Sequence, residues 1–274
     1  MATVIVPAHN EGTVIRRCLD SLVGQSDIDQ IIVACNGCTD NTVAIVTKDY
    51  PQVTCLDIST PSKVNALNEA EKHITSWPVF YIDADIALSD GAIKAVSEGM
   101  KKQGLLLAAP EPVIDISASS WLVRRFYDAW LSLPYIKEGV VATCSFVISE
   151  EGRKRFEQFP DVIADDGYVR SHFYANELGN VSGAKVYVAA PKTAASLIKI
   201  KTRARLGNME LTARKLGYDK PARDYGSVLS SLLFSRKWLS AIVYIGFVTV
   251  FRLRAKAQFR NLENYEWEVD HSSR

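Results

Sequence analysis

Short apolar runs alternate with amphipathic segments through residues 1–108, and no other feature constrains the fold as strongly. The runs predict strands at 3–7, 30–34, 53–58, 79–83 and 105–108. The segments between them predict helices at 13–23, 39–48, 62–73 and 89–101. Because short loops join strand to helix each time, the pattern predicts an α/β fold built on a doubly wound, mostly parallel sheet.

The alternation is looser after Pro112. Here the sequence predicts helices at 119–131, 150–156 and 193–216, strands at 139–148 and 185–190, and a loop leading into a helix at 164–174. With 274 residues, 47% of them hydrophobic, the chain can form one large domain or a domain with an elaborated end.

Charge is spread unevenly along the chain. The formal net charge is only +1, but residues 192–260 hold 15 Lys and Arg against 3 Asp and Glu. Such a local excess predicts a basic surface suited to phosphates, anionic lipid or nucleic acid, although a solvated helical face explains part of it.

The cysteines predict no disulfide framework. There are five, an odd number without regular spacing, so we expect free thiols in a reducing compartment. The first predicted strand begins at Thr3, which leaves no room for a signal peptide. Both observations favour a cytoplasmic location.

Two acids follow the apolar run at 79–82 directly. Asp83 and Asp85 stand one residue apart where the predicted strand ends. Ionised carboxylates are costly in an apolar core, but the carboxyl end of such a strand opens onto the ligand crevice of an α/β sheet. Two acids there can hold a divalent cation that binds phosphate oxygens. A solvated turn is the alternative reading.

A polar segment also follows the first strand, comprising Pro7, Ala8, His9, Asn10 and Glu11. The N-terminus of a helix stands behind it, and free N–H groups at such a terminus favour anions. The segment therefore suits a nucleotide, with an ordinary turn capped by Asn10 as the alternative.

Five motifs stand in order along the chain, each at a strand end: V-I-V-P-A-H-N-E, N-G-C-T-D-N-T, S-K-V-N-A-L-N, D-A-D and A-D-D. Together they resemble the signature of family 2 glycosyltransferases with the GT-A fold, over about residues 3 to 215. The resemblance implies inverting transfer of a sugar from a nucleotide-sugar donor, assisted by Mg²⁺ or Mn²⁺.

The resemblance assigns donor-side roles to six residues named here. Asn36 stands where the family usually has an aspartate that accepts the uracil N3–H. An asparagine carbonyl can accept that bond too, while its NH₂ can donate to another base, so the base stays open with a UDP-sugar favoured. Pro7, Ala8, Asn10 and Glu11 fall in the donor segment, and Lys63 matches a basic residue near the donor phosphates or is an exposed first-turn lysine.

The acid pairs receive the remaining roles. By resemblance, Asp83 faces the ribose and the metal, and Asp85 holds the metal. Asp165 and Asp166 match the family's E-D pair, in which the second acid is the general base. Adjacent acids repel, which raises one pKa. Helix capping is the other reading of this pair.

The family's Q-x-x-R-W motif is absent. The basic stretch 199–205 stands in its place. Arg203 and Arg205 are expected there to clamp the leaving diphosphate, or the acceptor phosphate.

The expected organisation is a GT-A catalytic domain at 1–220, with a donor half at 1–110 and an acceptor half at 111–220, followed by a basic and apolar extension at 221–274. The apolar run 238–251 has 14 residues, too few to cross a bilayer, which takes about 20. Flanked by basic residues, it is expected either to lie on the anionic inner face of the cell membrane or to pack on the domain.

The preferred function is thus a metal-assisted glycosyltransferase acting on a lipid-linked or saccharide acceptor, with no nucleic-acid partner. A non-catalytic module that binds membrane or nucleic acid explains the basic third but not the four acids. A sugar nucleotidyltransferase is disfavoured because no Gly-rich phosphate loop follows the first strand.

Overall fold

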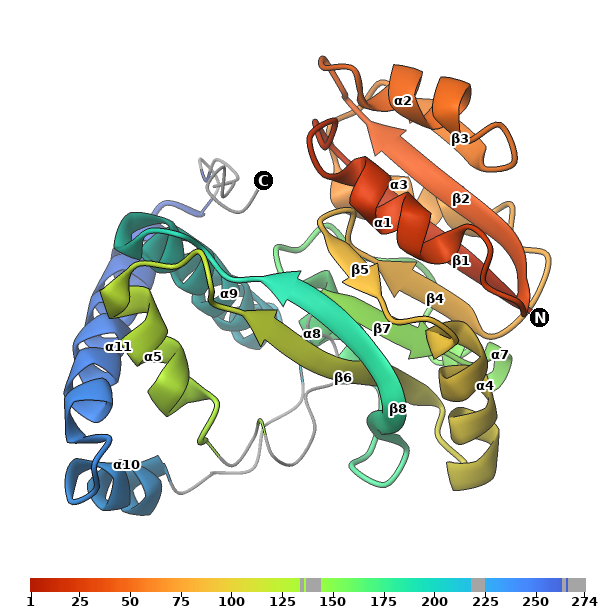
Figure 1. Cartoon of the computed structure of the whole chain (residues 1–274). Coiled ribbons are helices and arrows are strands. Elements are labelled where there is room, and N and C mark those ends of the chain that lie inside the picture. The colour runs from red at the N-terminus through yellow and green to blue at the C-terminus, as the bar shows by residue number, and fades with distance from the viewer. Residues whose placement is uncertain (134–135, 137–143, 218–224, 263–264, 266–274) are drawn as a thin grey trace.

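The computed structural model describes residues 1–133, 136, 144–217, 225–262 and 265 (Figure 1). The strands are β1 (Ala2–Ala8), β2 (Ile28–Asn36), β3 (Thr54–Ile58), β4 (Val79–Ile82), β5 (Ile86–Leu88), β6 (Leu107–Asp115), β7 (Ser145–Ile148) and β8 (Leu178–Ala189). The helices are α1 (Ile15–Leu22), α2 (Thr42–Asp49), α3 (Lys63–Glu71), α4 (Ala92–Gln103), α5 (Trp121–Trp130), α7 (Glu150–Arg153), α8 (Asp165–Arg170), α9 (Ala194–Ala213), α10 (Tyr225–Leu233) and α11 (Trp238–Phe259).

One eight-stranded sheet runs through the molecule in the order β3-β2-β1-β4-β7-β6-β8-β5. The first four strands are parallel to one another, as are β6 and β8. β7 is antiparallel to both of its neighbours, and β5 is antiparallel to β8. The central sheet is therefore mostly parallel, as the sequence predicts.

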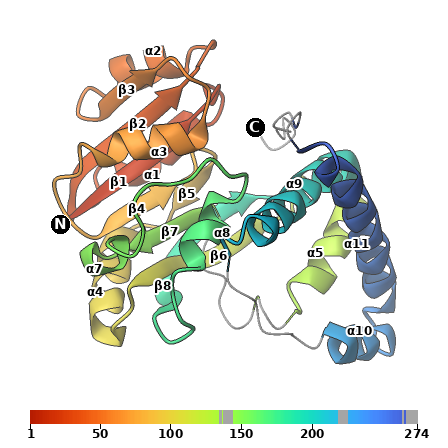
Figure 2. The ribbon, with the colours of Figure 1, turned by 180° about the vertical axis from the view of Figure 1, so that it is seen from behind.

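Helices cover both faces of this sheet. Alternate residues of β1 point to opposite sides, so Val4 and Val6 pack with α1 while Ile5 packs with α3. The view from behind shows α3 in front of the sheet and α1 beyond it (Figure 2). The prediction of a doubly wound sheet is confirmed.

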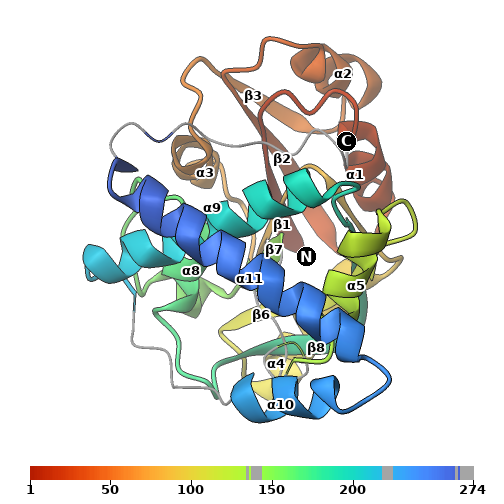
Figure 3. The same ribbon diagram turned by 90° about the vertical axis from the view of Figure 1, so that its left-hand side faces the viewer.

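The C-terminal helices pack against the acceptor half. α11 lies across α9 and contacts α5 (Figure 3), and its Phe247 and Phe251 are buried against Phe126. The helix continues past the apolar run to Phe259, and its 22 residues are, by length and composition alone, enough to cross a membrane. One face of the run thus packs on the domain, while the other stays exposed.

Some elements differ from the expectation. β5 and α10 were not predicted, and β6 extends to Asp115 instead of ending at Ala108. Proline interrupts a ladder, but Pro110 stands where the register between β6 and β8 shifts, and such irregularities accommodate proline. Part of the predicted strand 139–148, and the boundary at residue 220, lie outside the described residues. All five cysteines are free thiols, as predicted.

Candidate functional site

An open crevice of about 1150 Å³ lies at the carboxyl ends of β1, β2 and β4. Most of the candidate residues from the sequence line it: Pro7, Glu11, Asn36, Lys63, Asp83, Asp85, Asp165 and Arg203. The remaining candidates are not among its lining residues: Ala8, Asn10, Asp166 and Arg205.

Lys63 joins the donor-side and acceptor-side acids. Its Nζ lies 3.0 Å from Asp83 Oδ1 and 3.2 Å from Asp165 Oδ2. A cation is unfavourable in the first turn of α3, because that end of a helix carries partial positive charge. Burial would lower the pKa of Lys63, but the carboxylates of Asp165 and Asp83 outweigh it and hold the pKa above its usual value. The lysine is therefore a fixed cation at the junction of the two halves.

Asp83 and Asp85 suit a divalent cation that is shared with a substrate. Ala84 between them is buried, and the Asp83 N–H donates to Cys144 O at 2.9 Å, which fixes the turn. Among the described residues, no group of three or more His, Cys, Asp or Glu forms a complete metal cage. Mg²⁺ and similar ions commonly take one or two carboxylates and complete their shell with water and substrate phosphates, so these two acids fit such an ion.

Asp166 lies in the first turn of α8, beside Asp165. Its Oδ1 accepts a hydrogen bond from Gly167 N at 2.7 Å. Burial and then the charge of Asp165 raise the pKa of Asp166 to about 6, although Lys63 opposes the shift. A carboxyl group with a pKa near neutrality is suited to taking a proton from a hydroxyl group.

Asn36 ends β2 and is buried at the floor of the crevice. Its Nδ2 donates to Ala8 O at 2.9 Å and to Ala34 O at 3.4 Å. Both amide hydrogens are thereby used, so the side-chain carbonyl is the group left to face the crevice. Gly37 follows with φ of +57°, and a Cβ there would lie 2.6 Å from Pro61 Cβ, so a glycine is required.

The side chain of Asn10 binds the neighbouring loop. Its Oδ1 accepts from Thr39 N at 2.8 Å and from Asp40 N at 3.2 Å. The structure thus gives Asn10 no capping role at α1, whose N-cap is Val14, and joins the loops after β1 and β2 instead. Ala8 contributes its backbone carbonyl to the orientation of Asn36.

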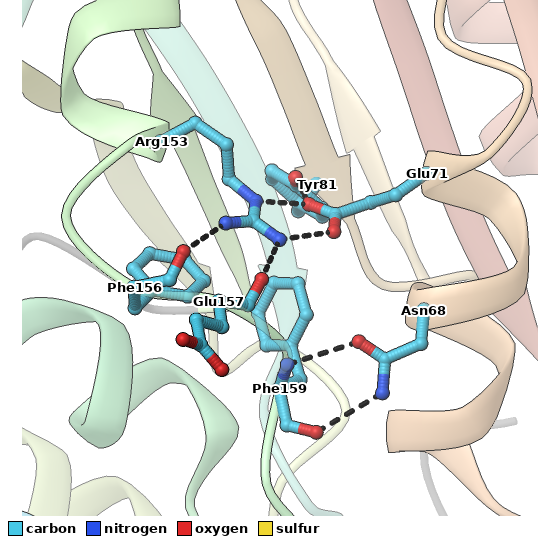
Figure 4. Close-up of polar contacts among 7 residues, drawn as sticks. All are labelled: Asn68, Glu71, Tyr81, Arg153, Phe156, Glu157 and Phe159. Carbon is cyan, nitrogen blue, oxygen red and sulfur yellow. Dashed lines mark hydrogen bonds and ion pairs between the residues drawn. The ribbon is translucent and has the colours of Figure 1, made fainter.

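A buried ion pair, not predicted from the sequence, fixes the loop after α7 to α3. Arg153 donates two hydrogen bonds of 2.6 Å to Glu71 of α3, and Tyr81 donates another to the same carboxylate (Figure 4). Arg153 also donates to the carbonyls of Phe156 and Glu157.

Asn68 holds the same loop one turn earlier on α3. Its amide pairs with both backbone groups of Phe159, at 2.9 and 3.0 Å (Figure 4). These contacts attach the segment that leads to Asp165 and Asp166 to α3. The same helix carries Lys63 and packs against the sheet that leads to Asp83, so α3 connects the two groups of acids.

α9 presents its basic residues on two different sides. Arg203 lines the crevice, but Arg205 lines a second pocket together with Lys201. Side chains two residues apart on an α-helix point in nearly opposite directions, because each residue turns the helix by about 100°. The structure therefore does not bring Arg205 to the donor crevice with Arg203.

Comparison with known proteins identifies relatives of this chain. The family model for glycosyl transferase family 2 matches residues 3–148, more than half of the chain. The chain is 29% identical over 132 residues to chondroitin synthase of Pasteurella multocida, covering 47% of this chain and 14% of that protein. It is 29% identical over 138 residues to the uncharacterized glycosyltransferase YibD of Escherichia coli, covering 48% of this chain and 38% of that one. The matches thus span well under half of these relatives.

Solved structures with a similar fold cover nearly the whole chain. A mannosyltransferase from Pyrobaculum calidifontis, in complex with GDP-Man and Mn²⁺, matches with a TM-score of 0.63 at 19% identity, covering 97% of this chain and 81% of that one. S. aureus TarS 1-349 in complex with UDP-GlcNAc matches with a TM-score of 0.57 at 15% identity, covering 96% and 76%. These likenesses confirm the predicted GT-A fold.

Proposed function

Because this chain belongs to glycosyl transferase family 2, we propose that it transfers a sugar, with inversion, from a nucleoside-diphosphate sugar to a hydroxyl group of a lipid-linked or saccharide acceptor. The observation that carries the proposal is the meeting of Lys63, Asp83 and Asp165 in one crevice. These residues come from three distant segments and bring a donor-side and an acceptor-side acid together.

The donor diphosphate is assigned to the part of the crevice at the carboxyl end of β4. Asp83 and Asp85 would hold a divalent cation there, which would supply positive charge to offset the negative charge on the leaving nucleoside diphosphate. Lys63 and Arg203, both in the crevice wall, add fixed positive charge beside the same group. Structures of similar fold with Mn²⁺ and with nucleotide-sugar donors support this assignment.

The acceptor hydroxyl is assigned to the side of Asp166. Inversion requires a base on the face of the sugar opposite the leaving group, and a positioned carboxylate with a pKa of about 6 meets that need. Asp165, held by Lys63, orients the first turn of α8. Neither a non-catalytic module nor a nucleotidyltransferase explains why a buried acid stands beside an ion-paired one here.

The carbonyl of Asn36 is assigned to the base of the donor. Since its NH₂ is bound to Ala8 and Ala34, the side chain accepts but does not donate. Uracil and guanine offer a ring N–H to such an acceptor, whereas adenine and cytosine can reach it only with an exocyclic amino group. We therefore assign a uridine or guanosine nucleotide-sugar as the donor, with UDP-sugars favoured by the resemblance.

A panel of nucleotides tests this proposal. UDP or GDP with Mn²⁺ is expected to raise the melting temperature, because a ligand at 100 times its Kd adds about 2.7 kcal/mol to the free energy of unfolding. ADP and CDP are expected to leave the melting temperature unchanged. Asn36→Ala should weaken UDP or GDP binding by about 1–3 kcal/mol, since a buried donor is left unpaired. Equal stabilisation by ADP or CDP, or unchanged affinity in Asn36→Ala with an unaltered nucleotide-free melting temperature, would contradict the assignment.

The exposed face of α11 is proposed to contact an anionic membrane. Its large apolar side chains form one stripe along the helix: Trp238, Ile242, Ile245, Val250 and Leu253. Phe234, 93% exposed, lies in the turn just before the helix. Exposed basic residues stand at both ends of the stripe, although Lys237 is already paired with Asp128 at 2.8 Å. An apolar stripe with basic flanks suits the surface of an anionic bilayer.

Flotation with vesicles of phosphatidylglycerol and phosphatidylcholine tests this contact at low salt. The double variant Ile242→Ser/Leu253→Ser should lose at least about tenfold in binding, because each buried side chain contributes roughly 1.5–3 kcal/mol. Tyr174→Ser is the matched control, since Tyr174 is 75% exposed but lies outside the stripe. Surface variants are preferable to truncation, because removal of α11 would uncover Phe126, against which Phe247 and Phe251 pack. A wild-type protein that ignores these vesicles, or a double variant that floats like the control, would contradict the proposal.

A further inference from the structure

A second pocket lies beyond α9 from the catalytic crevice. It has a volume of about 670 Å³ and is bounded by α5, α8, α9, α10 and α11. The side of α9 that carries Lys201, Arg205 and Asn208 faces this pocket, whereas the side with Arg203, Glu210 and Arg214 faces the crevice. One helix therefore forms a wall of both cavities.

Among the residues that the structure describes, the walls of this second pocket carry four cations and no acid. They are Arg170, Lys201, Arg205 and Arg252. None of the four forms an ion pair with any residue that the structure describes. Elsewhere in the protein, basic residues such as Lys63 and Arg153 are paired with carboxylates. Arg205 and Arg252 are exposed, but Arg170 and Lys201 are half-buried, and cations held partly out of water without a carboxylate are costly unless an anion binds among them.

Two of these cations, Arg170 and Lys201, are held partly out of water. The Nε of Arg170 is buried and makes no hydrogen bond within the described residues. Lys201 Nζ lies 4.6 Å from the ring centre of Trp130, and burial lowers the pKa of Lys201 to about 8. Burial, followed by the charge of Arg252, also lowers the pKa of Arg205.

The remaining walls are apolar and continue to the outer face of α11. Phe126 and Trp130 line the pocket from α5, and Tyr244, Ile245 and Val248 line it from α11. Ile245 is also 40% exposed and belongs to the stripe proposed to contact membrane. The pocket is thus cationic, lined by apolar side chains, and bordered by the same helix face that would lie on lipid.

We propose that this pocket binds a phosphate or diphosphate group carried on an apolar chain, as in a lipid-linked acceptor. The cations hold the phosphate, and the aromatic and aliphatic walls hold the first part of the chain. Gly167, which follows Asp166 in the sequence, lines the same pocket, so the helix that carries the proposed base also contributes to this wall. The assignment rests on the proposed function, because it identifies the acceptor of that reaction.

Calorimetry with the full-length protein tests the pocket with three probes below the concentration at which micelles form. Farnesyl phosphate carries both phosphate and chain, inorganic phosphate lacks the chain, and farnesol lacks the phosphate. Farnesyl phosphate should bind, and the other two should bind at least about tenfold more weakly. Lys201→Gln and Arg252→Gln should each weaken the binding of farnesyl phosphate about tenfold, as expected for loss of a charged hydrogen bond.

Lys199→Gln is the matched control, since Lys199 is an exposed lysine of α9 that does not line the pocket. It should bind farnesyl phosphate as the wild type does. Absence of binding in the wild type, or equal weakening by Lys199→Gln, would overturn the proposal. Equally tight binding of inorganic phosphate would assign the pocket to a free anion and overturn the lipid assignment.

Mn²⁺-dependent binding of UDP and GDP, measured on the same variants, separates this inference from the function on which it rests. It should be unchanged by Lys201→Gln and Arg252→Gln. Loss of nucleotide binding in the wild type would defeat the proposed function, whatever farnesyl phosphate does. Intact nucleotide binding without farnesyl phosphate binding would defeat the pocket assignment alone.

Discussion

Asp85→Asn is expected to lose sugar transfer by roughly 10³-fold. A metal ion supplies several kcal/mol of stabilisation to the developing charge on the leaving group, and each 1.4 kcal/mol or so changes the rate tenfold. The same variant should lose the Mn²⁺-dependent part of nucleotide binding, because Asp85 stands with Asp83 at the crevice. Initial rates and thermal shifts with and without Mn²⁺ measure the two effects.

Asp90→Asn provides the control for this variant, since Asp90 is exposed and lies outside the crevice. It should keep wild-type rates and metal dependence. Full transfer by Asp85→Asn, or by the wild type in excess chelator, would remove the metal from the mechanism.

Asp166→Asn should lower the rate by about 10²–10⁴-fold while leaving donor binding near normal, because loss of a general base affects the chemical step. Asp165→Asn should act differently. It breaks the ion pair with Lys63 and should weaken donor binding as well. A dead Asp165→Asn beside an active Asp166→Asn would show that the two roles are reversed.

The raised pKa of Asp166 adds a pH signature. The group is protonated in both folded and unfolded protein below about pH 4. As pH rises through about 6, the folded protein must give up a proton that burial holds, so this contribution to stability is lost. Asp166→Asn should therefore be more stable than the wild type at pH 8, by roughly 2–3 kcal/mol, and equally stable at pH 4. Urea unfolding in chelator at the two pH values measures this, and an equal difference at both would rule out the raised pKa.

The strand-end residues of the donor half could be predicted because parallel strands bring their carboxyl ends to one edge. Asp83 and Asn36 each follow an apolar run at the end of a predicted strand. Both residues are therefore expected at that edge, and this expectation does not depend on the fold of the C-terminal part. The need for glycine at position 37 was not predicted, because it depends on Pro61, which leaves no room for a Cβ.

Long-range pairing and helix rotation were harder to predict. β5 has only three residues and forms against β8, about a hundred residues away, so its sequence carries no local signal. The use of Asn10 as a link between loops depended on where the second loop lies. The placement of Arg205 away from Arg203 was available from helical periodicity, but the basic stretch was interpreted as one cluster. Which acid of the Asp165–Asp166 pair acts as the base remains a prediction.

The Arg153–Glu71 ion pair has a consequence for chimeric enzymes. It joins α3 of the donor half to the loop that carries the acceptor-side acids, and its side chains are only 16% and 12% exposed. A recombinant that takes residues 1–110 from one parent and 111–217 from another will leave one charge buried without its partner unless both parents share the pair. Breaking a buried pair of this kind costs about 3–5 kcal/mol, which is a large fraction of the stability of a domain. Viable crossovers in this scaffold should therefore transfer Glu71 and Arg153 together.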